Sequence, residues 1–290
     1  MNHSIGRRGF LKAGAALGAG IGLVGMGSRP LWAAAAGAPN AEKIGWRLAC
    51  QAYSFNQYTF FEAIDKNASL GLHFIEAYPG QRISSSIKDG IGEGLSAANR
   101  KLVLKKLADS GVKLVNFGVT GVGPRTFEFA KDMGIETLVA EPGENQFDQL
   151  DKLCEEFGIN VAIHDHPKPS HYWNPDTVLK VTKGRSKRIG ACCDTGHWMR
   201  SNLNPIECLK RLEGRIISFH FKDLNKMGGD AHDVPWGTGQ GNVKGMLAEV
   251  RRQGVKAVFS IEYEYHWTSS LPEIGQCVEY FDKVAAELAA

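Results

Sequence analysis

A (β/α)8 TIM barrel is the fold class that the sequence predicts, as a single domain over residues 37–290. Three observations support this prediction. Short β-rich runs alternate eight times with amphipathic stretches, a glycine stands where most helices should end, and ionisable residues gather where the strands should finish.

The strand candidates are rich in β-branched and aromatic residues. In chain order they are residues 47–53, 72–78, 112–119, 135–141, 159–166, 189–194, 215–221 and 256–263. A doubly wound sheet would more often have about five to seven strands, with a glycine-rich nucleotide loop after the first. Residues 51–57, QAYSFNQ, form no such loop, so the barrel is favoured.

The helix candidates lie between these runs, for example at 97–111, 147–158 and 204–214. Asn174-Pro175 and Asn204-Pro205 are typical helix starts, with asparagine as the cap and proline in the first turn. Glycines that can take a positive φ stand just before the following strands, at positions 71, 111, 134, 158, 214 and 254.

Residues 1–36 are predicted to be an export signal and not part of the barrel. Arg7 and Arg8, followed by Phe10, Leu11 and Lys12, resemble a twin-arginine motif. The apolar run at 13–27 is glycine-rich and shorter than the roughly 20 residues of a membrane span. We therefore expect a periplasmic or otherwise exported protein without a stable membrane anchor.

The charge of the chain is concentrated in this segment. Removing residues 1–36 removes four basic residues and no acidic one, so the formal net charge changes from +3 to −1. A nearly neutral domain has no overall field that attracts nucleic acid, and no nucleic-acid partner is expected. The six cysteines match no paired metal motif, and most are expected to be buried apolar residues.

Ionisable side chains end several strand candidates, on the barrel face where active sites form. Converging carboxylates repel one another unless a cation lies among them. Glu141, Asp194, His220 and Glu262 therefore predict one divalent ion, with Mn²⁺ favoured and Mg²⁺, Co²⁺ or Zn²⁺ left open. Such an ion would polarise a sugar carbonyl, while one glutamate removes a neighbouring proton and another returns it.

Seven short segments, taken in order, resemble the xylose isomerase-like barrel superfamily, which includes the sugar phosphate isomerases and epimerases. They are FIEAYPG (74–80), LVAEPG (138–143), AIHDHP (162–167), CDTGH (193–197), SFHFKD (218–223), PWGTGQGNV (235–243) and SIEYE (260–264). The resemblance covers essentially all of residues 46–289.

The resemblance implies roles for individual residues. It places the metal ligands at Glu141, Asp194, His220 and Glu262, with Glu141 and Glu262 as the catalytic acid and base. It also implies that His197 contacts a substrate oxygen and that Glu76 and His166 line the pocket. The family often has His-Asn-His or Glu-Asn-His at strand five, where this chain has His164-Asp165-His166.

Three further side chains are expected at the substrate. His164 joins the binding residues, Lys222 could bind substrate beside Asp223 or form an exposed salt bridge, and Trp236 could stack on a sugar face. The loop that contains His232 and Asp233 is either a lid or a variable connection.

The leading hypothesis is a metal-dependent isomerase or epimerase that acts on a free sugar or keto-sugar. The same proton abstraction would also serve a lyase or hydratase acting on 3-keto-glycosides. A nuclease similar to endonuclease IV and a non-catalytic sugar-binding protein are two less favoured hypotheses. Assembly into a homo-oligomer is left open.

Overall fold

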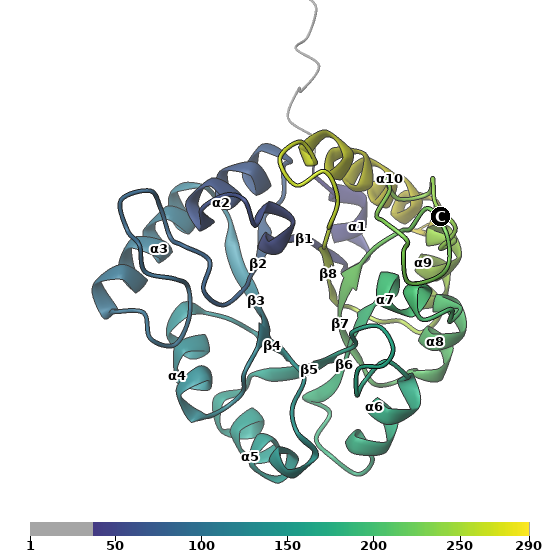
Figure 1. The fold of residues 1–290 in the computed structure, drawn as a ribbon, viewed down its shortest axis with the longest axis horizontal. Helices are drawn as coiled ribbons and strands as arrows, with labels where there is room; N and C mark the ends of the chain where they lie inside the picture. Colours follow the sequence, from purple (N-terminus) through teal and green to yellow (C-terminus); the bar gives the residue numbers. More distant parts are fainter. Residues whose placement is uncertain (1–36, 290) are drawn as a thin grey trace, which may run out of the picture. The chain divides into compact units, whose positions relative to one another are not determined.

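A computed structural model describes residues 37–289, so the predicted export signal at 1–36 lies outside the described residues. Eight parallel strands close into a barrel in sequence order, with helices around it (Figure 1). The strands are β1 Arg47–Gln51, β2 Phe74–Ala77, β3 Lys113–Thr120, β4 Thr137–Ala140, β5 Asn160–His164, β6 Ile189–Asp194, β7 Ile216–Phe221 and β8 Val258–Ile261. The predicted fold class is confirmed, and the strands are mostly a few residues shorter than predicted.

The barrel closes because β1 pairs with both β2 and β8, with Cys50 opposite Ile75 and Ile261. The α-helices are α1 Pro39–Lys43, α2 Phe60–Ser69, α3 Ala97–Asp109, α4 Pro124–Met133, α5 Phe147–Phe157, α6 Pro175–Thr182, α7 Thr195–Arg200, α8 Pro205–Arg211, α9 Val243–Arg252 and α10 Leu271–Ala289. Two short 3-10 helices, Ala52–Phe55 and Glu144–Gln146, follow β1 and β4.

The helix ends follow the sequence signals. The side chains of Asn174 and Asn204 accept backbone N–H groups at the starts of α6 and α8. Gly134 and Gly158 end α4 and α5 with φ of 73° and 69°, in the left-handed region that only glycine enters at low cost. The helices therefore begin and end where these asparagines and glycines predicted.

The core has two layers because successive side chains of a strand point to opposite faces. Cys192 packs inside the barrel with Val139 and Ala162, whereas Cys193 belongs to the larger core between the strands and the helices. All six cysteines are buried, as expected for small apolar core residues, and none is paired in a disulfide.

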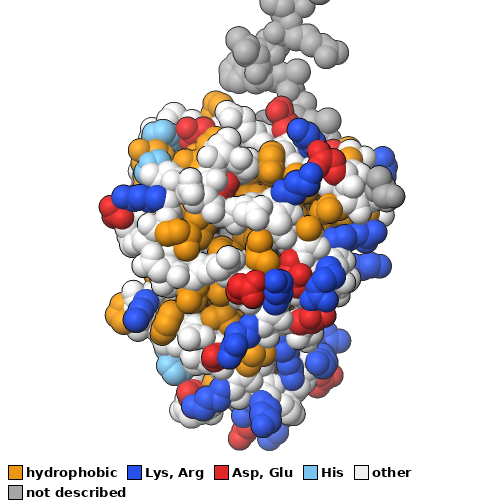
Figure 2. All heavy atoms as spheres, turned by 90° about the vertical axis from the view of Figure 1, so that its right-hand side faces the viewer, with side chains coloured by type: hydrophobic (Ala, Val, Ile, Leu, Met, Phe, Trp, Pro, Cys, Tyr) orange, Lys and Arg blue, Asp and Glu red, His pale blue; other side chains and the backbone are white. Residues whose placement is uncertain are grey.

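Charged side chains of both signs alternate on the face that carries α8 and α9 (Figure 2). Exposed ion pairs join several of them, including Arg252 with Glu213 at 2.7 Å. Among the described residues, no helix combines the length and the apolar character that crossing a membrane requires.

Candidate metal centre and pocket

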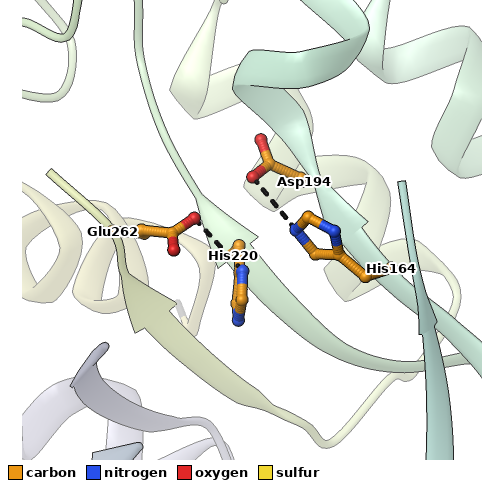
Figure 3. A group of neighbouring side chains, drawn as sticks. All are labelled: His164, Asp194, His220 and Glu262. Carbon is orange, nitrogen blue, oxygen red and sulfur yellow. Dashed lines mark ion pairs between the residues drawn. The ribbon is translucent and has the colours of Figure 1, made fainter. Parts of the chain in front are cut away.

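Four buried side chains converge at the carboxyl ends of neighbouring strands. They are His164 at the end of β5, Asp194 at the end of β6, His220 in β7 and Glu262 just after β8 (Figure 3). One potential ligand atom from each lies within 4.8 Å of the others. His164 Nε2 is 3.6 Å from Asp194 Oδ2, and His220 Nδ1 is 3.2 Å from Glu262 Oε2.

Each of the two imidazoles is held from outside by a carboxylate. Glu141 Oε1 lies 3.2 Å from His164 Nδ1, and Glu76 Oε1 lies 2.8 Å from His220 Nε2. The inner nitrogens, His164 Nε2 and His220 Nδ1, are buried and make no hydrogen bond within the described part of the chain. Buried polar atoms are normally satisfied, and outer carboxylates commonly orient metal-binding histidines. This donor set fits a divalent cation.

Glu76 lies beneath the pocket and not on its wall. Its carboxylate is fully buried and accepts hydrogen bonds from Ser260 Oγ at 2.5 Å, Gln51 Nε2 at 3.1 Å and Asn116 Nδ2 at 3.3 Å. Glu76 therefore contacts His220 and does not line the cavity, where it was expected from the sequence.

Asp194 uses its two oxygens for different purposes. Oδ1 accepts the backbone N–H of His197 at 2.8 Å and so caps α7, a helix not predicted from the sequence. Oδ2 faces His164, His197 and Lys222. Burial alone would raise the pKa of Asp194, but His197 and Lys222 lower it well below its usual range. The group therefore carries a negative charge at the centre of the cluster.

Glu141 is not a member of the four-residue group. Its carboxylate pairs with both His164 and His166, which places it one imidazole away from Asp194. Burial raises the pKa of Glu141, but the hydrogen bonds from these two histidines outweigh burial and lower it to about 2. His164 stands in the four-residue group where Glu141 was expected, and Glu141 forms a second group of potential metal ligands with His164 and His166.

Lys222 is fully buried within the same cluster. Its Nζ donates to Asp194 Oδ2 at 2.5 Å and to Glu262, and lies 3.4 Å from Glu264 Oε2. A substrate contact or an exposed pair with Asp223 was expected from the sequence. Lys222 is not among the residues that line the cavity described below. It also forms no exposed pair with Asp223, which accepts three loop N–H groups, from Gly237, Gly239 and Gly241.

A cavity of about 270 Å³ opens beside the cluster. It is lined by Tyr53, Tyr78, Pro79, Gly118, Val119, His164, His166, His197, Glu262 and Glu264. Three predicted binding residues, His164, His166 and His197, thus line one pocket with Glu262. Trp236 does not, because it is buried against Phe221 and Phe281, and the expected substrate contact gives way to a packing role.

An ion-pair network that was not predicted from the sequence borders the pocket. Arg200 lies 3.2 Å from both Asp233 and Glu264, and its Nη1 is 3.1 Å from His197 Nδ1. Burial lowers the pKa of His197 well below its usual value, so the ring is neutral and accepts this bond at Nδ1. The sequence spacing could have indicated this network. Arg200 is three residues after His197 on a helix, and Glu264 is two residues after Glu262, so each pair is expected on one face of its segment.

The sequence profile of the family described as "Xylose isomerase-like TIM barrel" matches residues 124–284. The chain belongs to this family. Among curated proteins, an uncharacterised Sinorhizobium fredii protein, y4fM, is 28% identical over 106 residues, which are 35% of this chain and 32% of that protein. The chain thus aligns with about a third of the curated relative that it matches.

Three solved structures share the barrel over nearly their whole length. An uncharacterised protein from Parabacteroides distasonis is 33% identical with a TM-score of 0.68, over 82% of this chain and 99% of that one. A D-tagatose 3-epimerase-like protein is 18% identical with a TM-score of 0.65, over 84% and 100%. A Mycobacterium smegmatis xylose isomerase-like barrel in complex with magnesium is 14% identical with a TM-score of 0.66, over 84% and 98%.

Proposed function

We propose that the protein is a divalent-metal-dependent isomerase or epimerase that moves a proton next to the carbonyl of a free sugar or keto-sugar. One observation carries this proposal: two buried imidazole nitrogens without hydrogen-bond partners in the described part of the chain face two carboxylates at the mouth of a TIM barrel. Family membership supports the same class of chemistry.

The proposed ligands are His164, Asp194, His220 and Glu262. The two imidazole nitrogens suit Zn²⁺ or Co²⁺ better than Mg²⁺, which prefers oxygen ligands, and the two carboxylates also suit Mn²⁺, which is the ion that we propose. When bound, the ion would supply positive charge that polarises the substrate carbonyl and stabilises the enediolate formed on proton removal.

The protein's own groups would move the proton. Glu262 lines the pocket as a carboxylate, because His220 and Lys222 lower its pKa against the effect of burial. It is the proposed base for the carbon next to the carbonyl. His166 also lines the pocket, and its hydrogen bond to Glu141 raises its pKa, so this pair is the proposed acid that returns a proton.

The remaining pocket walls suit an uncharged sugar. The neutral His197 accepts from Arg200 at Nδ1, so its proton lies on Nε2. Nε2 lies 3.5 Å from Asp194 Oδ2, and it could donate to a substrate oxygen in place of that carboxylate. Tyr53 and Tyr78 pack edge to face at 5.1 Å and supply an aromatic wall. Within residues 37–289, no lysine or arginine lines the cavity, and a phosphosugar would need such a cation.

Deuterium exchange tests the proposal. The domain of residues 37–290 would be incubated with Mn²⁺ and keto-sugars, including ketohexoses and 3-keto-glucosides, in D₂O and followed by proton NMR. Exchange at the α-carbon with a new sugar isomer supports the proposal, whereas exchange with loss of a β-substituent would identify the lyase or hydratase. No exchange with any keto-sugar would contradict proton abstraction as the reaction.

A nuclease and a sugar-binding protein would each give a distinct result. Incision of DNA at abasic sites would favour a nuclease. If Glu262→Gln retained full exchange or turnover, Glu262 would not be the base. If the wild type bound sugars without turnover, the protein would be a binding protein.

Export through residues 1–36 is likewise proposed, and cell fractionation of the full-length chain tests it.

A further inference from the structure

The Lys222 ammonium lies among the carboxylates proposed as metal ligands. Nζ contacts Asp194 and Glu262, the two acidic members of the four-residue group drawn in Figure 3. A cation that neutralises both carboxylates removes the repulsion that would otherwise require a metal ion. The Lys222 ammonium thus contacts the same two carboxylates, Asp194 and Glu262, that are proposed to bind the metal ion.

The Lys222 side chain is held in this place along its whole length. The Thr195 hydroxyl donates to the Lys222 carbonyl and accepts from its N–H, each at 2.8 Å. Gly196 leaves room for the aliphatic stem: a Cβ there would lie 2.6 Å from Lys222 Cδ and 2.9 Å from Lys222 Cβ. Three consecutive residues therefore fix Lys222: Asp194 binds its ammonium, Thr195 binds its backbone, and Gly196 packs against its aliphatic stem.

A third anionic partner of Lys222 lies next to Asp194 and Glu262. Glu264 Oε2 is 3.4 Å from Lys222 Nζ, on the side of the cluster where Arg200 also pairs with Glu264. Glu264 does not belong to the four-residue group of potential ligands. The ammonium could therefore leave Asp194 and Glu262 and still keep a carboxylate partner after a short movement.

We propose that Lys222 is the internal cation of the metal-free centre and that it competes with the divalent ion for Asp194 and Glu262. Metal binding displaces the ammonium toward Glu264, and no covalent bond is made or broken. The binding of the ion must offset the loss of the lysine contacts, so the affinity for metal is set partly by Lys222. This inference rests on the proposed metal-dependent function.

The test is Mn²⁺ binding by calorimetry, together with melting temperatures in EDTA and in MnCl₂. Lys222→Met keeps the stem and removes the charge. We expect it to bind Mn²⁺ about tenfold more tightly than the wild type, in the range of typical coupling between two sites. Without metal it should melt at a lower temperature, and Mn²⁺ should raise that temperature by more than in the wild type.

Two further variants complete the test. Lys226→Met is the matched control, because Lys226 pairs with Asp230 on the exposed surface and its removal should not alter Mn²⁺ affinity. Glu264→Gln should weaken Mn²⁺ binding several-fold, since the displaced ammonium loses its other partner. This variant decides the matter if Lys222→Met does not fold.

The outcomes separate this inference from the proposed function. Unchanged or weaker Mn²⁺ binding by Lys222→Met, with normal binding by the wild type, overturns the inference and leaves the metal-dependent reaction in place. Binding by Lys222→Met but not by the wild type supports the inference and contradicts the reaction. Absence of Mn²⁺ binding by both proteins overturns both.

Discussion

His220 Nε2 lies 2.8 Å from Glu76 Oε1 at the floor of the candidate metal centre. The contact fixes the ring so that Nδ1 points toward Glu262. Because the carboxylate is fully buried and bonded to Ser260, it can hold the ring in one orientation. Glu76, which does not line the pocket, therefore holds one of the potential metal ligands in place.

Glu76→Gln should lower metal affinity by about 10–100-fold, the usual effect of losing an outer partner of a metal-binding histidine. The amide cannot accept all the hydrogen bonds that the carboxylate accepts, so the His220 ring loses its fixed orientation. Calorimetric titration with Mn²⁺ measures the change. Glu136→Gln is the control, because Glu136 pairs with Arg47 at an exposed position. Equal affinities for both variants would contradict the positioning role.

His164 and Glu141 should have different effects on metal binding. His164→Ala removes a proposed ligand and should abolish measurable Mn²⁺ binding. Glu141→Gln removes only the group that orients His164 and should reduce affinity by about tenfold. Metal content after dialysis distinguishes them, with the exposed His171→Ala as control. Loss of the ion in Glu141→Gln but not in His164→Ala would restore the ligand set expected from the sequence.

Asp194 should show separate structural and metal-binding effects. Asp194→Asn keeps an oxygen that can cap α7, whereas Asp194→Ala does not. Both variants should lose metal, but the alanine variant should be less stable by about 1 kcal/mol in EDTA, the typical value of a helix cap. Urea unfolding measures the difference. Equal stabilities of the two variants would show that the cap contributes little.

The fold could be predicted from the sequence because its signals are local. All eight strands form where β-rich runs predicted them, and caps such as Asn204 stand at helix starts. The site was predicted less completely, since it depends on how strand ends face one another. His164 and Glu141 end neighbouring strands, and sequence alone did not show which of them turns toward Asp194.

Buried polar networks were the hardest feature to predict. Lysine is usually a surface residue and is rarely buried without a charged partner, so the sequence did not indicate that Lys222 is buried. Its partners come from β6 and from the segment after β8, which only the closed barrel brings together. Trp236 shows the reverse case, an aromatic near a strand end that packs in the core.

Stability should depend on pH through Asp233. Burial raises the pKa of Asp233 to about 7, although Lys222 and Arg200 oppose this effect. A carboxyl group with a raised pKa in the folded state binds its proton more tightly than in the unfolded chain. Its contribution to stability therefore falls as pH rises between about 4 and 7, by at most ~1.4 kcal/mol per pH unit.

Asp233→Asn should remove this part of the pH dependence. Unfolding free energies from urea titrations at several pH values between 5 and 8 measure it in both proteins. The exposed Asp230→Asn is the control and should keep the wild-type profile. Superimposable slopes for the wild type and Asp233→Asn would contradict the raised pKa.

Anomalous diffraction from crystals grown with Mn²⁺, recorded at an energy sensitive to manganese, tests the central claim most directly. We predict one anomalous peak in coordination contact with His164 Nε2, His220 Nδ1, Asp194 and Glu262, with the Lys222 ammonium moved toward Glu264. A peak held instead by Glu141 and His166, or no peak at saturating Mn²⁺, would contradict the proposed metal centre.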